Sequence, residues 1–104
     1  MNAYIDDENT SCDPTGALHV EAIVSRSAME LVYQIKFLKD NVVFDTQAVD
    51  LMGQNPNSGS TMNFEADTLV SCGSDYSLKV EVYYYSLTGN STPSSAYTQS
   101  CPCE

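Results

Sequence analysis

The spacing of the four cysteines excludes most of the chemical roles that cysteine can have. Cys12 and Cys72 stand alone, whereas Cys101 and Cys103 are separated only by Pro102. That gap is shorter than the spacing of about two to four residues between paired zinc ligands, and no Cys-x-x-Cys redox pair occurs. An even number of cysteines without metal or redox spacing is typical of disulfides in an exported protein. A four-thiolate zinc site is the alternative.

Catalysis requires an acid, a base or a nucleophile that converge on one point, and the sequence offers few candidates. His19 is the only histidine, and because no nucleophile motif surrounds it, we interpret it as a surface residue of a strand. No glycine-rich phosphate loop follows any strand-like segment. Four carboxylates fall in strand-like segments without a glycosidase arrangement, namely Asp45, Asp50, Glu65 and Asp67. We therefore expect a protein that is not an enzyme and that holds neither a cofactor nor a metal.

The net charge of the chain limits its partners. Fourteen Asp and Glu residues against four Lys and Arg residues give a formal charge of −10. Such a surface repels phosphate backbones and anionic lipids, so binding to nucleic acids or membrane surfaces is disfavoured. Residues 6–9 form an acidic run, but they lack the alternating ligands and the glycine of an EF-hand loop, so we do not assign calcium to them.

The length and the glycosylation motifs point to one exported domain. A chain of 104 residues is long enough for a single domain with a core, and it has no apolar stretch that could cross a bilayer. Two N-glycosylation motifs start at Asn9 and Asn90, both in loop-like segments. Together with the cysteines they predict an extracellular or cell-surface location, although residues 1–11 lack the pattern of an export signal.

The element that organises the chain is a predicted strand over residues 76–85, where apolar and polar residues alternate. The positions expected in the core are Tyr76, Leu78, Val80, Val82 and Tyr84. Residues 17–25 alternate in the same way and predict a second strand with one buried face. The core positions expected there are Leu18, Val20, Ala22 and Val24.

Residues 28–40 fit either an amphipathic helix or a strand. Their Val, Tyr, Ile and Phe content favours a strand, with Leu31, Tyr33, Ile35 and Phe37 on one face. Residues 40–41 then form a tight turn into a strand-like run over residues 41–52, so we expect a hairpin. Residues 53–61 predict a loop, residues 61–70 a strand that breaks near residue 67, residues 88–94 a loop, and residues 96–100 a last short strand.

The count is six strands, or seven if residues 3–5 form an edge strand. Their spacing of about 8–12 residues predicts an all-β, antiparallel sandwich rather than an α/β fold. We expect one domain over residues 1–104, with residues 101–104 as a cysteine-containing tail. Residues 1–11 are expected to be flexible or to donate a strand to another molecule.

Residues 64–98 resemble the closing strands of a fibronectin type III or related immunoglobulin-like sandwich. The resemblance rests on the strand at 68–70, the turn Gly73-Ser74-Asp75, the tyrosine-led strand at 76–82 and the loop at 89–95. It implies that Tyr76 is the corner tyrosine, whose ring packs in the core while its hydroxyl bonds nearby backbone. The chain has no tryptophan, so Tyr33 or Phe37 would replace the core tryptophan of the family.

In a sandwich of this kind, seven strands alternating in direction bring the first loop, the fifth loop and the C-terminus to one end. Cys12 and Cys72 fall in those two loops, beside the C-terminal pair. We therefore expect Cys12 and Cys72 each to pair with either Cys101 or Cys103. Two such bridges would stabilise the fold by roughly 2–4 kcal/mol each.

The resemblance implies a non-enzymatic module for binding or adhesion. Its expected contact face carries Gln34, Lys36, Tyr83 and Tyr85, and tyrosines suit recognition because they offer large area at low entropy cost. The expected partner is a protein, a glycan or another copy of the chain. The alternative is a subunit of an extracellular filament or capsid, in which residues 3–5 complete a neighbour's sheet and disulfides link the chains.

Overall fold

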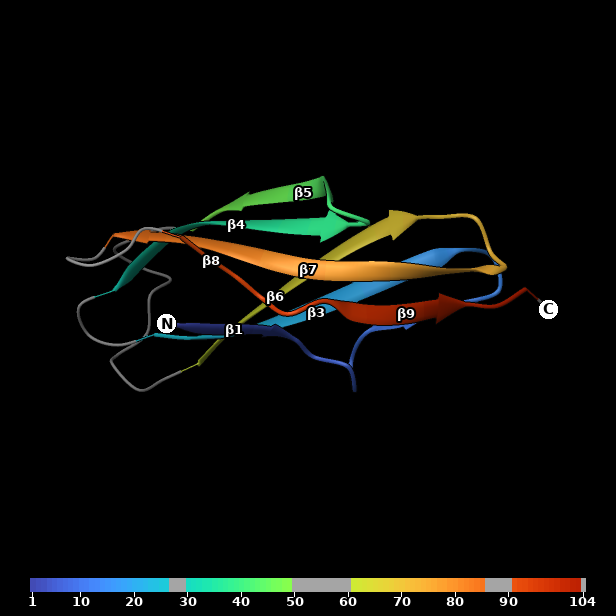
Figure 1. Cartoon of the computed structure of the whole chain (residues 1–104), viewed down its shortest axis with the longest axis horizontal. Coiled ribbons are helices and arrows are strands. Elements are labelled where there is room, and N and C mark those ends of the chain that lie inside the picture. Colours follow the sequence, from blue (N-terminus) through green and yellow to red (C-terminus); the bar gives the residue numbers. More distant parts are fainter. Residues whose placement is uncertain (27–29, 50–60, 86–90, 104) are drawn as a thin grey trace.

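The chain folds into two antiparallel β-sheets that enclose one hydrophobic core (Figure 1). The computed structural model describes residues 1–26, 30–49, 61–85 and 91–103, and these contain nine strands and no helix. The first sheet consists of β1 (Asn2–Ile5), β2 (Ser11–Cys12), β3 (Ala17–Ser25) and β6 (Thr61–Leu69). The second consists of β4 (Leu31–Lys39), β5 (Val42–Ala48), β7 (Ser74–Tyr85), β8 (Ser91–Pro93) and β9 (Tyr97–Cys101). The all-β, antiparallel prediction is confirmed.

The strand count exceeds six or seven because two edge strands are each split in two. β1 and β2 pair with successive parts of β3, whose other edge pairs with β6. In the second sheet, β8 and β9 pair with successive parts of β7, whose other edge pairs with β4. The segment predicted as a loop at residues 88–94 therefore contains β8, and residues 3–5 lie in a strand of their own chain.

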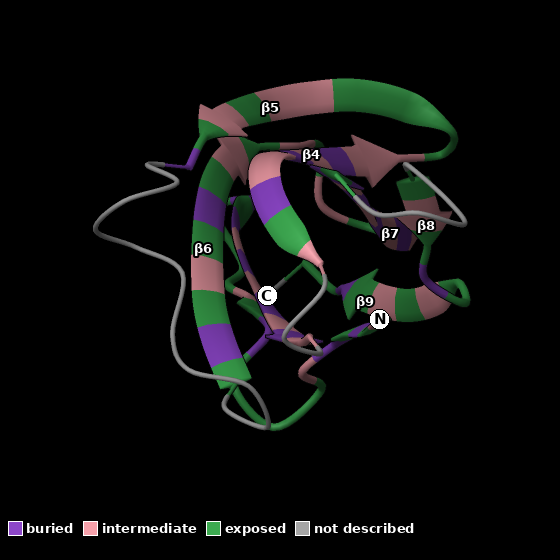
Figure 2. Ribbon diagram, turned by 90° about the vertical axis from the view of Figure 1, so that its left-hand side faces the viewer, coloured by how far each residue is buried: buried purple, intermediate pink, exposed green. Residues whose placement is uncertain are grey.

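The core is formed by the alternating residues that the sequence pattern selects. All four predicted positions of β3 are buried, and so are Leu78, Val80, Val82 and Tyr84 of β7. Tyr76 is half-buried and packs against the same core. Figure 2 shows this alternation along β6, where every second residue is exposed and those between are buried or half-buried. Each fully buried Leu or Val contributes roughly 1.5–3 kcal/mol relative to an exposed one.

β4 is a strand, as favoured, but the predicted face is wrong at its beginning. The register between β4 and β7 shifts between Val32 and Gln34, which marks a β-bulge. An extra residue moves the side chains before it to the opposite face, so Val32 is fully buried while Tyr33 lies outside. After the bulge, Ile35 and Phe37 are buried as predicted. Phe37, and not Tyr33, therefore fills the core.

The hairpin between β4 and β5 is confirmed. Asp40 and Asn41 have φ angles of 50° and 66°, the left-handed conformations that a two-residue hairpin turn requires. The break predicted near Asp67 is wrong, because β6 pairs with β3 in continuous register as far as Leu69. Residues 50–60, predicted as the end of a strand and a loop, lie outside the described residues.

Candidate functional site

The outward face of the second sheet brings together the residues expected to form a contact surface. We call Tyr33, Gln34, Lys36, Tyr83 and Tyr85 the tyrosine face. Gln34 pairs across the strands with Tyr83, and Tyr85 lies two residues further along the same strand, so that they share one side of the sheet. Tyr33 was expected in the core and joins this face through the bulge.

The aromatic rings of the tyrosine face are held against one another. The rings of Tyr33 and Tyr85 stack with centroids 4.5 Å apart, and those of Tyr33 and Tyr83 are tilted with centroids 6.3 Å apart. The ammonium group of Lys36 lies 5.0 Å from the centroid of the Tyr83 ring, within range of a cation–π interaction. The Tyr83 hydroxyl donates to the carboxylate of Glu81. These contacts restrict the ring positions before any partner arrives.

The tyrosine face is partly open to solvent despite these internal contacts. Tyr85 is 58% exposed and its cross-strand neighbour Leu31 is 39% exposed, while the other four residues of the face are half-buried. A fixed, partly apolar surface with hydroxyl and ammonium groups suits recognition, because little side-chain entropy is lost on binding. This arrangement offers contact area rather than a converging acid and base.

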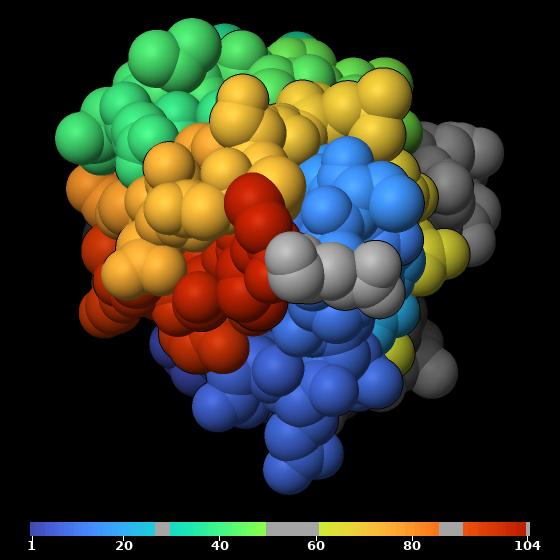
Figure 3. Space-filling view, turned by 90° about the vertical axis from the view of Figure 1, so that its right-hand side faces the viewer, coloured from blue at the N-terminus to red at the C-terminus, as the bar shows by residue number. Residues whose placement is uncertain are grey.

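The two disulfides join chain segments that gather at the end of the molecule seen in Figure 3, where the C-terminal segment also lies. Cys12 is bonded to Cys101 and Cys72 to Cys103, with Cα–Cα distances of 5.2 and 5.1 Å. In Figure 3 the C-terminal segment, in red, lies between the yellow-orange segment linking β6 to β7 and the blue N-terminal part. Each early cysteine thus has one C-terminal partner in the same chain, and no thiol is free for a zinc site or for the disulfides between chains that the filament alternative included. Two such bonds indicate a non-reducing environment.

Tyr76 lies at the start of β7, close to these disulfides. Its hydroxyl donates to the backbone oxygen of Ser71, 2.7 Å away and five residues earlier in the chain. Its ring packs against the core, and the Lys39 ammonium lies 5.4 Å from the ring centroid. The side chain therefore ties the segment between β6 and β7 to the body of the fold.

The acidic run at residues 6–9 forms a turn after β1. Asp6 accepts hydrogen bonds from the backbone amide of Glu8 and from the side chain of Asn9, at 3.3 and 2.7 Å. Asn9 is exposed, as a glycosylation site must be. Asn90 lies outside the described residues.

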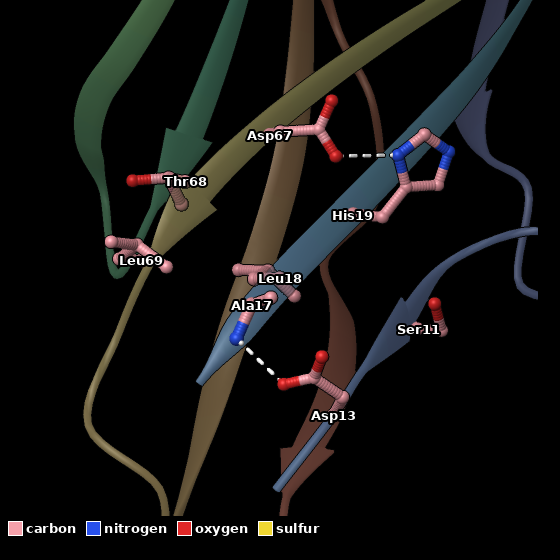
Figure 4. A pocket seen from close by; sticks show the side chains of 8 residues that line it. All are labelled: Ser11, Asp13, Ala17, Leu18, His19, Asp67, Thr68 and Leu69. Atoms are coloured by element: carbon pink, nitrogen blue, oxygen red, sulfur yellow. Dashed lines mark hydrogen bonds and ion pairs between the residues drawn. The ribbon is translucent and has the colours of Figure 1, made fainter. Parts of the chain in front are cut away.

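A shallow cavity of about 370 Å³ lies where β2, β3 and β6 meet (Figure 4). His19 lines it, and its Nδ1 lies 2.7 Å from the Asp67 carboxylate. This hydrogen bond raises the pKa of His19, with further contributions from the charges of Asp67, Glu21 and Glu65, against an opposing effect of desolvation. His19 was expected on the surface of a strand, and it is one-third exposed there. Its carboxylate partner was not predicted, because His19 and Asp67 are neighbours only through the β3–β6 register.

No family model, no curated protein and no solved structure matches the chain. Among the described residues, no helix is long and apolar enough to cross a membrane.

Proposed function

We propose that this chain is a fibronectin type III-like binding module of an extracellular or cell-surface protein, without catalytic activity. Support for the fold comes from the sheet order: with each split edge counted once, the nine strands occupy seven positions in two antiparallel sheets. The hydrogen bond from Tyr76 to Ser71 adds support, because a corner tyrosine in these sandwiches bonds the backbone a few residues upstream.

The observation that carries the proposed function is the stacked pair of Tyr33 and Tyr85 on an open sheet face. Tyr85 is exposed and Tyr33 is half-buried beneath it, and such stacked tyrosines present the area and the hydrogen-bonding groups common in recognition surfaces. Lys36 adds positive charge to this face of a chain whose net charge is −10. Glu81 lies directly opposite Lys36 on this face, so the two charges offset each other and a hydroxyl-rich partner suits the face best.

The proposed location is supported by the two disulfides and by the exposed Asn9 motif. Disulfides persist in oxidising compartments such as the extracellular space. The negative charge is compatible with solubility there and disfavours adhesion through anionic lipids.

Binding of the intact module to cell surfaces tests the proposal. Biotinylated, disulfide-bonded protein assembled into tetramers would be applied to a panel of cells and to extracellular matrix. Saturable staining that a Tyr85→Ala tetramer lacks would support the proposed function. Protease and glycosidase treatment of the cells would then separate a protein partner from a glycan. Absence of saturable staining across the panel, or equal staining by the variant, would contradict it.

A filament subunit is the second candidate, and the size and position of β1 favour it. β1 has four residues, lies at a sheet edge and pairs with β3, while Ala3 and Ile5 fill the core. Such a strand could equally be supplied by a neighbouring copy. Light scattering of the native protein across a hundredfold range of concentration tests this candidate. Large species would favour the filament, and a constant monomer mass would exclude it under those conditions.

A further inference from the structure

We propose that His19, Glu21 and Glu65 form a surface binding site for a divalent transition-metal ion, with Zn²⁺ the best fit. The site lies on the outward face of the first sheet. It is separate from the tyrosine face, which belongs to the second sheet, and it does not depend on the proposed binding function.

The strand pairing places the three side chains together. His19 and Glu21 are two residues apart on β3 and therefore project from the same face. Glu65 of β6 lies directly opposite Glu21, and Asp67 lies directly opposite His19. One ligand atom from each of His19, Glu21 and Glu65 falls within 4.8 Å of the others.

The distances around the imidazole are close to those of a metal site. His19 Nε2 lies 3.8 Å from a Glu21 oxygen and 3.5 Å from a Glu65 oxygen. Ligand atoms at about 2.0–2.1 Å from a tetrahedral zinc ion lie roughly 3.3 Å from one another. Glu65 is 65% exposed and Glu21 27% exposed, so both side chains have room for the small rotation that remains.

Asp67 orients the imidazole for this role. When the ring is neutral with its proton on Nδ1, that proton is donated to the Asp67 carboxylate at 2.7 Å (Figure 4). Nε2 then keeps a free lone pair, and it is the atom nearest to Glu21 and Glu65. A carboxylate that holds the far nitrogen of a metal-binding histidine is a recurrent partner in zinc sites, where it fixes the ring and raises its basicity.

The charges of the cluster also favour a cation. Glu21 and Glu65 face each other across β3 and β6, and like charges in that position destabilise a sheet. Among the ion pairs of the described residues, both carboxylates share His19 as their partner. A dication between them would replace this repulsion with two attractive contacts. One imidazole nitrogen and two carboxylates suit zinc better than calcium, which takes six to eight oxygen ligands.

Isothermal titration of ZnCl₂ into the intact, disulfide-bonded protein at pH 7.5 tests the site. We expect one zinc ion per chain, and at least a tenfold weaker affinity for His19→Gln and for Glu65→Gln. The control Glu8→Gln removes one negative charge from the exposed turn after β1 and should leave the affinity unchanged. The proposal is overturned if the wild type shows no saturable binding, or if Glu8→Gln weakens binding as much as Glu65→Gln.

A second measurement on the wild-type protein does not depend on how the variants fold. Zinc should shift and broaden the ring NMR signals of His19, the only histidine in the chain, with saturation at one equivalent. The same addition of CaCl₂ should leave these signals in place. Unchanged ring signals at one equivalent of zinc would overturn the proposal. Loss of zinc binding would leave cell staining by the tyrosine face untouched, so the two proposals can fail separately.

Discussion

The hydroxyl of Ser94 accepts a hydrogen bond from the backbone amide of Val80, at the gap between β8 and β9. The distance is 2.9 Å, and both residues are buried. The first sheet repeats this arrangement at the gap between β1 and β2. There the Thr10 hydroxyl accepts a hydrogen bond from the backbone amide of Glu21, at 3.1 Å. In both sheets a side-chain oxygen thus replaces the backbone acceptor that an unbroken edge strand would supply.

Loss of the Ser94 hydroxyl should be costly, because it leaves the Val80 amide buried without an acceptor. We expect Ser94→Ala to lower the free energy of unfolding by about 1–3 kcal/mol. The exposed neighbour Ser95→Ala serves as the control and should change it by less than about 0.5 kcal/mol. Urea denaturation of both variants measures the difference. Equal stability of the two variants would show that the amide finds another partner.

The two disulfides should differ in how readily they are reduced. Cys101 is fully buried, whereas Cys103 is exposed and its partner Cys72 is partly so. A mild thiol reductant should therefore open Cys72–Cys103 first, which alkylation and peptide mass spectrometry would detect. Earlier reduction of Cys12–Cys101 would contradict the exposure argument.

The two disulfides should also differ in how much they stabilise the fold. Cys12–Cys101 closes the longer segment, with a sequence separation of 89 against 31 residues. Replacing both of its cysteines by alanine should lower the free energy of unfolding by roughly 1 kcal/mol more than the same change at Cys72 and Cys103. An equal loss for the two double variants would contradict this prediction.

Two glycines with nearly the same φ angle provide a matched test of close packing. Gly16 and Gly73 have φ angles of 89° and 88°, which disfavour any other residue. A Cβ at Gly16 would overlap the Val70 carbonyl oxygen, whereas at Gly73 the nearest atom would be the Cys103 sulfur at an ordinary 3.5 Å. Gly73→Ala should cost about 1 kcal/mol from backbone strain alone. Gly16→Ala should lower the free energy of unfolding by clearly more than this. Thermal unfolding of both variants measures the difference, and an equal loss of stability would contradict the prediction.

The raised pKa of His19 predicts how its contribution to stability depends on pH. A group with a raised pKa in the folded state stabilises the fold fully below its unfolded pKa, and this stabilisation is lost as the pH rises through the folded pKa. The stability difference between wild type and His19→Gln, measured in EDTA, should therefore shrink from about pH 5.5 to pH 8.5. It should stay below about 1 kcal/mol, because the carboxylates of Asp67 and Glu65 are largely exposed and solvent screens their attraction to the ring. A difference that grows with pH would contradict this assignment.

Much of the fold could be predicted from the sequence because one face of each long strand is buried. Apolar residues recur at every second position of β3 from Leu18 to Val24 and of β7 from Tyr76 to Tyr84, and only one register buries this set. The bulge in β4 could not be predicted in this way. Val32 and Tyr33 are both apolar, so shifting the pattern by one residue leaves an apolar residue at the core position.

The tyrosine face could be predicted although β4 and β7 are far apart in sequence, because the two strands adjoin in the sandwich that the sequence resembles. Four of its five residues were predicted in this way, and the resemblance offers no such guide to the partners of His19. The cluster around His19 needs the register of β6 on β3, which separates partners by more than forty residues in sequence. The sequence around the two edge-strand gaps predicts loops, because Thr10 and Ser94 lie among residues typical of turns.

The contact surface of the module is tested most directly by comparing exposed tyrosines on its two sheets. Tyr85 lies on the tyrosine face, and Tyr4, which is 44% exposed, lies in β1 of the other sheet. The measurement is the apparent dissociation constant of tetramer staining for wild type, Tyr85→Ala and Tyr4→Ala. We expect Tyr85→Ala to weaken binding at least tenfold and Tyr4→Ala to weaken it less than twofold. The reverse order, or an equal effect of both substitutions, would contradict a contact surface on the tyrosine face.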